Sequence, residues 1–79
     1  MQESGGNYLE TIYLLQKEGK DVHSVDVAKA LGFSKPSVSR AMGLLKNGGF
    51  IRIDDGGYIT LTDEGREVAE TIYERHTIL

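Results

Sequence analysis

Apolar residues recur at helical spacing near the start of the chain and predict a helix over residues 3–18. The residues that form this pattern are Tyr8, Leu9, Ile12, Tyr13 and Leu15. At 3.6 residues per turn they fall on one face, as in an amphipathic helix that packs against a core. Gly19 and Lys20 are expected to end the helix, because glycine readily adopts the left-handed conformation found after helices.

A second, shorter helix is predicted over residues 24–31. Ser24 is the expected N-cap, and Asp26 lies in the first turn, where a negative charge is favourable. The apolar stripe of this helix consists of Val27, Ala28 and Leu31. Gly32 is expected to end it after about two turns.

A third helix is predicted over residues 35–47, with Ser34 as its N-cap. Pro36 fits the first turn, where the missing N–H of proline costs no hydrogen bond. The inward face is expected to consist of Val38, Ala41, Met42, Leu44 and Leu45. The sequence Asn47-Gly48-Gly49 then stops the helix.

A β-hairpin is predicted over residues 50–61, since two runs of β-branched and aromatic residues flank the turn sequence Asp54-Asp55-Gly56-Gly57. A last helix is predicted over residues 62–78, with its start at Thr62. The order of helix, helix, turn, helix, hairpin and helix predicts a mostly α fold with a small β-hairpin, a winged helix-turn-helix. We expect residues 1–79 to form this single domain.

Size and composition narrow the class of protein. The chain has 79 residues, 39% of them hydrophobic and 27% charged, as in a small globular domain. It contains no cysteine, which excludes disulfides and thiolate metal sites. No apolar run approaches the roughly 20 residues that span a bilayer, and the N-terminus lacks the layout of a signal peptide. We therefore expect a cytoplasmic protein without membrane contact.

The net charge of −3 is unevenly distributed along the chain. Residues 24–53 carry a net charge of +4, whereas residues 1–23 carry −2 and residues 54–79 carry −5. A phosphate group responds to the local field more than to the total charge of a chain. The basic middle third is therefore compatible with nucleic-acid binding by an acidic protein.

The third helix carries the chemistry of a DNA-recognition helix, which enters the major groove with its N-terminal residues first. Arg40 is the best candidate for reading bases, because a guanidinium can pair in a bidentate manner with guanine. Pro36 could contact a thymine methyl group, while Arg52 could touch the DNA backbone or minor groove from the wing. Phosphate contacts are expected from Ser34, Lys35, Ser39 and Lys46. The full set of predicted DNA-binding residues is Ser34, Lys35, Pro36, Ser37, Ser39, Arg40, Lys46 and Arg52.

Other readings of the same residues remain open at this point. Ser34 could be only an N-cap, and Lys29 and Lys46 could be ordinary solvated charges. A winged helix can also act as a metal-independent transcriptional regulator or as a protein-interaction module. An enzyme is not expected, because the chain has no Ser/His/acid set and no glycine loop that would hold a phosphate.

Several segments of the chain together resemble one known family. They are "NYLETIY" at residues 7–13, "SVDVA" at 24–28, "SKPSVS" at 34–39, "GYITLT" at 57–62 and "RH" at 75–76. The sequence resembles the diphtheria-toxin-repressor family of iron- or manganese-dependent transcriptional repressors of bacteria. The resemblance implies a dimeric repressor that binds palindromic operators in double-stranded DNA when loaded with Fe²⁺ or Mn²⁺.

The resemblance also implies candidate metal ligands. Glu10 and His76 match ligand positions of the family, and Asn7 matches a third position, where the family more often has Asp or Met. An amide oxygen is a weaker donor than a carboxylate. Family members continue into a helical domain with the main dimer interface and further ligands, so we expect this chain to lack that domain and to bind little or no metal alone.

Overall fold

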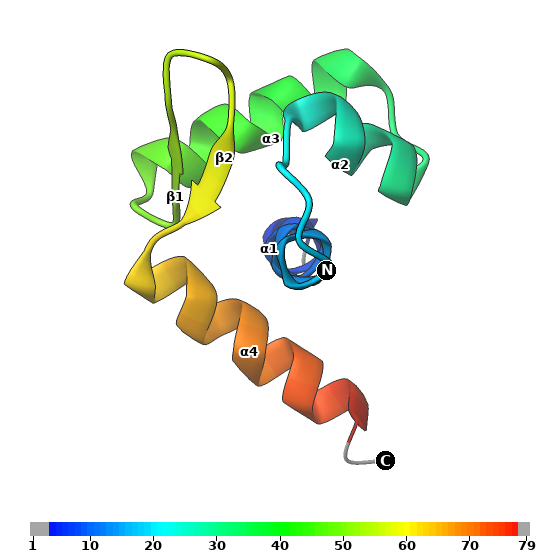
Figure 1. Cartoon of the computed structure of the whole chain (residues 1–79), viewed down its shortest axis with the longest axis vertical. Helices are drawn as coiled ribbons and strands as arrows, with labels where there is room; N and C mark the ends of the chain where they lie inside the picture. The colour runs from blue at the N-terminus through cyan, green and yellow to red at the C-terminus, as the bar shows by residue number, and fades with distance from the viewer. Residues whose placement is uncertain (1–3, 78–79) are drawn as a thin grey trace.

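The computed structural model describes the backbone of residues 4–77 and the side chains of residues 7–75. In chain order the elements are α1 (Ser4–Lys17), α2 (Ser24–Leu31), α3 (Lys35–Asn47), β1 (Ile51–Ile53), β2 (Ile59–Leu61) and α4 (Asp63–Thr77). Figure 1 shows α3 and α4 near opposite ends of the long axis, with α1 between them. The strands form an antiparallel hairpin beside α3. This arrangement confirms the predicted winged helix-turn-helix fold.

The element boundaries differ slightly from the predicted ranges at the two long helices. The first helix ends at Lys17, and Glu18 and Gly19 form the turn that follows. The last helix begins at Asp63, one residue later than predicted, because Thr62 is its cap. Residues 3 and 78, the predicted outer limits, lie outside the described residues.

The core is a single apolar cluster to which every described helix and both strands contribute. Ile12, Val27, Val38 and Ala69 have no exposed surface. Among the described residues no polar or charged side chain is buried. The buried residues of the cluster are Tyr8, Leu9, Ile12, Val22, Val27, Ala28, Val38, Met42, Leu45, Ile51, Ile59, Leu61 and Ala69. The domain is therefore held together by burial of apolar surface.

Two details of the predicted helices are wrong. Leu44 was expected to face inward, but its side chain is 67% exposed. Successive helical residues are rotated by about 100°, so the burial of Leu45 turns Leu44 toward solvent. Ser24 was expected to cap α2, but the N-cap is His23. The Asp26 carboxylate accepts a hydrogen bond of 2.8 Å from the His23 N–H, which fixes the cap one residue earlier.

The wing is attached to the rest of the fold along β2. The strands pair with Ile51 opposite Leu61 and Arg52 opposite Thr60. The Ile59 N–H donates a hydrogen bond of 2.7 Å to the carbonyl of Val22, in the loop before α2. These contacts place one face of the hairpin on the core and leave the face with Arg52 and Thr60 exposed.

Candidate nucleic-acid interface

The N-terminal half of α3 presents small and cationic side chains to solvent. The Ser34 hydroxyl caps the helix by accepting a hydrogen bond of 3.4 Å from the Ser37 N–H, and it donates one of 2.9 Å to the Ser37 hydroxyl. No acidic residue lies in the first turn. The exposed residues of this half are Lys35, Pro36, Ser37, Ser39 and Arg40. The helix dipole and the cationic side chains therefore give this end of α3 a positive potential toward solvent.

The exposed face of α3 brings together side chains that could reach into a groove. Ser37, Arg40 and Leu44 are separated by three and four residues, so they lie on neighbouring turns of one face. Val38, Met42 and Leu45 anchor the opposite face in the core. Within the described part of the chain, neither Lys35 nor Arg40 forms an ion pair. Their charges are therefore not neutralised by an acidic side chain.

The remaining predicted contacts lie beside this face or at its end. Arg52 is exposed on β1, and β1 packs next to α3. A shallow groove between α3, the start of α2 and the wing is lined in part by Ser24, Ser39 and Gly57. Lys46 is exposed in the last turn of α3, where a cation also stabilises the helix through its dipole. The structure thus places the predicted residues along α3 and the adjoining strand.

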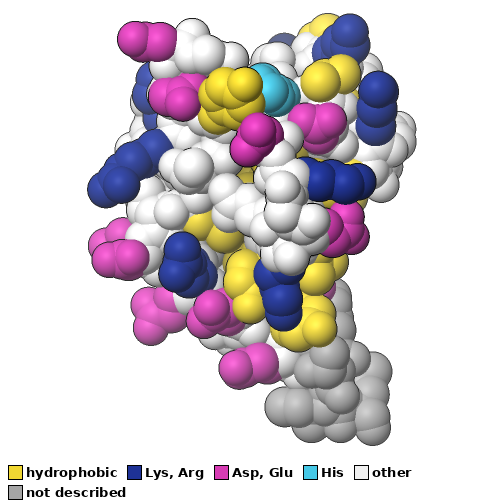
Figure 2. Space-filling model, viewed as in Figure 1, with side chains coloured by type: hydrophobic (Ala, Val, Ile, Leu, Met, Phe, Trp, Pro, Cys, Tyr) yellow, Lys and Arg dark blue, Asp and Glu magenta, His cyan; other side chains and the backbone are white. Residues whose placement is uncertain are grey.

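The tip of the wing is acidic and is internally organised. The Asp54 carboxylate accepts hydrogen bonds of 2.9 Å from the N–H groups of Gly56 and Tyr58. Asp54 is therefore a turn-forming residue, while Asp55 is exposed beside it. Figure 2 shows acidic side chains over the wing tip and over α4. This distribution leaves α3 as the element best suited to face phosphates.

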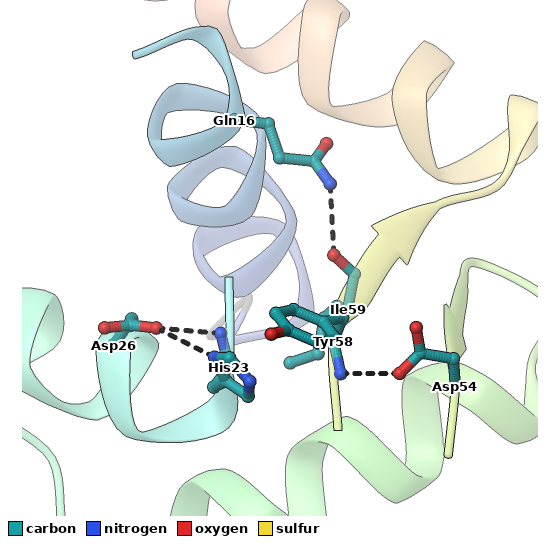
Figure 3. Close-up of polar contacts among 6 residues, drawn as sticks. All are labelled: Gln16, His23, Asp26, Asp54, Tyr58 and Ile59. Carbon is teal, nitrogen blue, oxygen red and sulfur yellow. Dashed lines mark hydrogen bonds and ion pairs between the residues drawn. The ribbon is translucent and has the colours of Figure 1, made fainter. Parts of the chain in front are cut away.

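One feature near this surface was missed by sequence reasoning. The imidazole of His23 lies against the ring of Tyr58, with centroids 4.3 Å apart (Figure 3). No local sequence pattern predicts this pair, because His23 and Tyr58 lie far apart in the chain. The pair brings the start of α2 into contact with the wing.

The predicted metal ligands are only partly described. Asn7 is exposed and Glu10 is half-buried, and both lie on α1. His76 belongs to α4, but its side chain lies outside the described residues. Across the described residues no group of three His, Cys, Asp or Glu side chains could hold a metal. An amide and a carboxylate on one helix supply too few donors for a firm Fe²⁺ or Mn²⁺ site, so the described ligands do not fit a complete centre.

Helices α1 and α4 nevertheless contact each other close to these positions. Tyr13 and Tyr73 meet edge to face with ring centroids 5.9 Å apart. The Lys17 ammonium lies 5.3 Å from the centre of the Tyr13 ring and 4.8 Å from that of Tyr73.

The described part of the chain contains no helix long and apolar enough to cross a membrane.

These features define the class of protein: a winged helix-turn-helix DNA-binding domain. The family described as "Iron dependent repressor, N-terminal DNA binding domain" matches residues 1–58. The chain belongs to this family. The family consists of repressor domains that bind DNA, so the expectation that this domain is not an enzyme is confirmed.

Named relatives agree with this assignment. The chain is 31% identical to the iron-dependent repressor IdeR of Mycobacterium tuberculosis over 71 residues, which are 90% of this chain and 31% of IdeR. It is 36% identical to the transcriptional regulator MntR of Salmonella typhimurium over 73 residues, which are 92% of this chain and 46% of MntR. The chain therefore spans about a third of the length of IdeR and less than half of MntR.

A solved structure supports the same relationship. The manganese regulator SloR superposes on 96% of this chain with a TM-score of 0.82 and 25% sequence identity. The superposed region is 35% of the SloR chain. The fold described above thus corresponds to one part of a larger regulator in that case.

Proposed function

We propose that this chain is the operator-binding domain of a metal-dependent transcriptional repressor, and that α3 enters the major groove of double-stranded DNA. The observation that carries the proposal is the exposed N-terminal half of α3, which combines hydroxyl groups, Lys35 and Arg40 without any acidic side chain in its first turn. Small side chains permit close approach to base edges, and the positive end of the helix dipole favours phosphate.

Roles for the individual residues follow from their places on the surface. Arg40 points outward from the middle of α3 and is proposed to read guanine. Pro36 is proposed to contact a thymine methyl group. Arg52 is proposed to touch the backbone or minor groove from the wing. Phosphate contacts are proposed for Ser34, Lys35, Ser39 and Lys46. Ser37 lies on the same face as Arg40 and is proposed to contact DNA beside it.

The wider role of the protein is inferred from its relatives. IdeR is named an iron-dependent repressor and SloR a manganese regulator, so Fe²⁺ or Mn²⁺ is the proposed effector of the whole regulator. When bound, such an ion would be held by oxygen and nitrogen donor atoms of the protein. Asn7, Glu10 and His76 are the residues of this chain proposed to take part. Because the described donors do not form a complete centre, no step of DNA binding is assigned to the ion.

The proposed target is a palindromic operator bound by two copies of the regulator in the bacterial cytoplasm. Half-sites one helical turn apart require two recognition helices held about 34–36 Å apart. One copy of this domain provides one recognition helix. We therefore expect a single domain to bind a half-site weakly, with tight binding when two domains are joined.

The central test compares Arg40→Ala with Arg66→Ala. Arg66 is an exposed arginine in the first turn of α4, outside α3 and the wing strands. A duplex is first selected with the wild-type chain from a random-sequence pool, and each variant is then titrated by fluorescence anisotropy. Loss of a bidentate arginine contact of about 1–3 kcal/mol predicts a roughly 5- to 150-fold weaker complex for Arg40→Ala. Arg66→Ala should bind as the wild type does.

The salt dependence of binding separates base reading from phosphate contact. Removing one phosphate contact lowers the slope of log affinity against log salt by about 0.9. Lys35→Ala and Lys46→Ala are expected to reduce the slope in this way on every duplex. If Arg40→Ala changes neither the affinity nor the preference for the selected duplex, α3 is not the recognition helix.

A further inference from the structure

The contact between His23 and Tyr58 joins the helix-turn-helix unit to the wing. The ring centroids are 4.3 Å apart and the planes are inclined by 49° (Figure 3). His23 is the N-cap of α2, and Tyr58 directly precedes β2. The two side chains therefore connect elements that are distant in the sequence.

His23 is held in place by its own surroundings. Its N–H donates a hydrogen bond of 2.8 Å to the Asp26 carboxylate, and its Nδ1 lies 3.6 Å from the same oxygen. The carbonyl of the preceding residue, Val22, accepts a hydrogen bond from the Ile59 N–H at 2.7 Å. The imidazole thus projects from a backbone that is fixed on one side by α2 and on the other by β2.

Tyr58 is fixed in a corresponding way from the wing. Its N–H donates a hydrogen bond of 2.9 Å to the Asp54 carboxylate. Gly57, the residue before it, has φ of +86°, a conformation that glycine adopts readily. Beyond Tyr58, the Ile59 carbonyl accepts a hydrogen bond of 3.1 Å from the Gln16 side chain of α1 (Figure 3). The turn therefore places the tyrosine ring against the imidazole of His23.

We propose that His23 is a positioning residue for the wing, which sets the orientation of the hairpin and of Arg52 relative to the exposed face of α3. An isolated two-stranded hairpin is marginally stable, so its direction depends on what it packs against. On the outer half of this hairpin, the His23 ring supplies a side-chain contact in addition to the backbone pairing of Ile59. The inference rests on the proposed function, because wing orientation matters for binding when α3 and the wing meet one duplex.

The experiment is an NMR titration of ¹⁵N-labelled chain with the selected duplex. His23→Asn removes the ring but retains a side chain that is favourable at an N-cap. His23→Phe is the matched control, since it retains an aromatic ring against Tyr58. In the wild type we expect DNA to shift amide signals of both α3 and the wing. In His23→Asn the α3 signals should still shift, the wing shifts should fall by more than half, and affinity should drop three- to tenfold.

The outcomes separate this inference from the proposed function. His23→Phe should behave as the wild type, which distinguishes ring packing from capping. Equal DNA-induced shifts of the wing signals in His23→Asn and in the wild type would overturn the inference. It would also be overturned if, in the wild type, DNA shifted the signals of α3 but not those of the wing. If no duplex shifts the α3 signals, the proposed function itself fails. Should His23→Asn not fold, Tyr58→Leu removes the same contact from the wing and leaves the cap intact.

Discussion

The hydroxyl of Thr62 donates a hydrogen bond of 2.6 Å to the carbonyl of Gly49. The same oxygen accepts a hydrogen bond of 3.1 Å from the Gly65 N–H in the first turn of α4. Thr62 is therefore both the cap of α4 and a link to the turn that follows α3. One side chain joins the turn after α3 to the start of α4.

Replacement of Thr62 by alanine should remove both the cap of α4 and the hydrogen bond to the Gly49 carbonyl. Loss of a threonine cap costs about 0.5–2 kcal/mol, and the freed Gly49 carbonyl adds to that cost unless water replaces the donor. We expect the free energy of unfolding to fall by about 1–2 kcal/mol in urea denaturation. Thr62→Ser retains the hydroxyl and should lose less than half as much. Equal losses for the two variants would show that the hydroxyl contributes little.

Gly65 and Gly43 should respond in opposite directions to substitution by alanine. A Cβ atom at Gly65 would collide with the backbone carbonyl of Phe50, whereas at Gly43 it would meet no atom within 4 Å. Gly65→Ala should therefore destabilise the fold by at least about 2 kcal/mol, since well-packed sites resist added atoms. Gly43→Ala should stabilise α3 by about 0.5–1 kcal/mol, because alanine is the better helix former. The unfolding temperature of each variant measures the effect. A change of the same sign in both variants would contradict the difference in packing around the two glycines.

The Lys17 ammonium should stabilise the contact between α1 and α4. It lies within 5.3 Å of the ring centres of both Tyr13 and Tyr73. Lys17→Met keeps the apolar stem and removes the charge, so we expect a loss of about 0.5–1 kcal/mol in urea denaturation.

Lys20→Met is the matched control for Lys17→Met. Lys20 lies 3.5 Å from Glu18 in a solvent-exposed ion pair, and such pairs contribute little. Its change in unfolding free energy should stay within about 0.5 kcal/mol. If both lysine variants lose the same stability, the aromatic rings have no special role.

The chain by itself should bind Mn²⁺ weakly. Asn7 and Glu10 offer a neutral amide and one carboxylate, whereas Mn²⁺ favours octahedral oxygen coordination. Calorimetric titration should therefore give no site in the micromolar range or tighter. Asn7→Asp adds a carboxylate one helical turn from Glu10 and should raise the affinity. A micromolar site in the wild-type chain that is lost in Glu10→Gln would contradict this expectation.

Much of the local structure followed from the sequence. The apolar spacing around Ile12 predicted α1, Ser34 and Pro36 predicted the start of α3, and the glycine-rich turn predicted the hairpin. These signals are local, since periodicity and capping act between residues a few positions apart. The errors were also local: Asp26 selected His23 over Ser24 as the N-cap, and the packing of Leu45 exposed Leu44.

The roles proposed for Arg40, Lys35 and Arg52 could be read from the sequence because charge and side-chain size are properties of residue type. The inward face predicted for α3 also left Lys35 and Arg40 on the outer side, whereas the exposure of Arg52 depends on how the hairpin packs on the core. The metal ligands were implied by resemblance and not by pattern. The structure leaves Asn7 and Glu10 on one helix and does not describe the side chain of His76.

By itself the sequence determined the order of helices and strands and the cationic character of α3, because these depend on periodicity, capping and residue type. Only the tertiary structure decided that His23 packs against Tyr58, that Thr62 joins Gly49 to α4, and that Lys17 of α1 lies over Tyr73 of α4. Each of these contacts joins residues far apart in the chain. Such contacts form only when burial of the shared core brings separate elements together, and no local pattern encodes them.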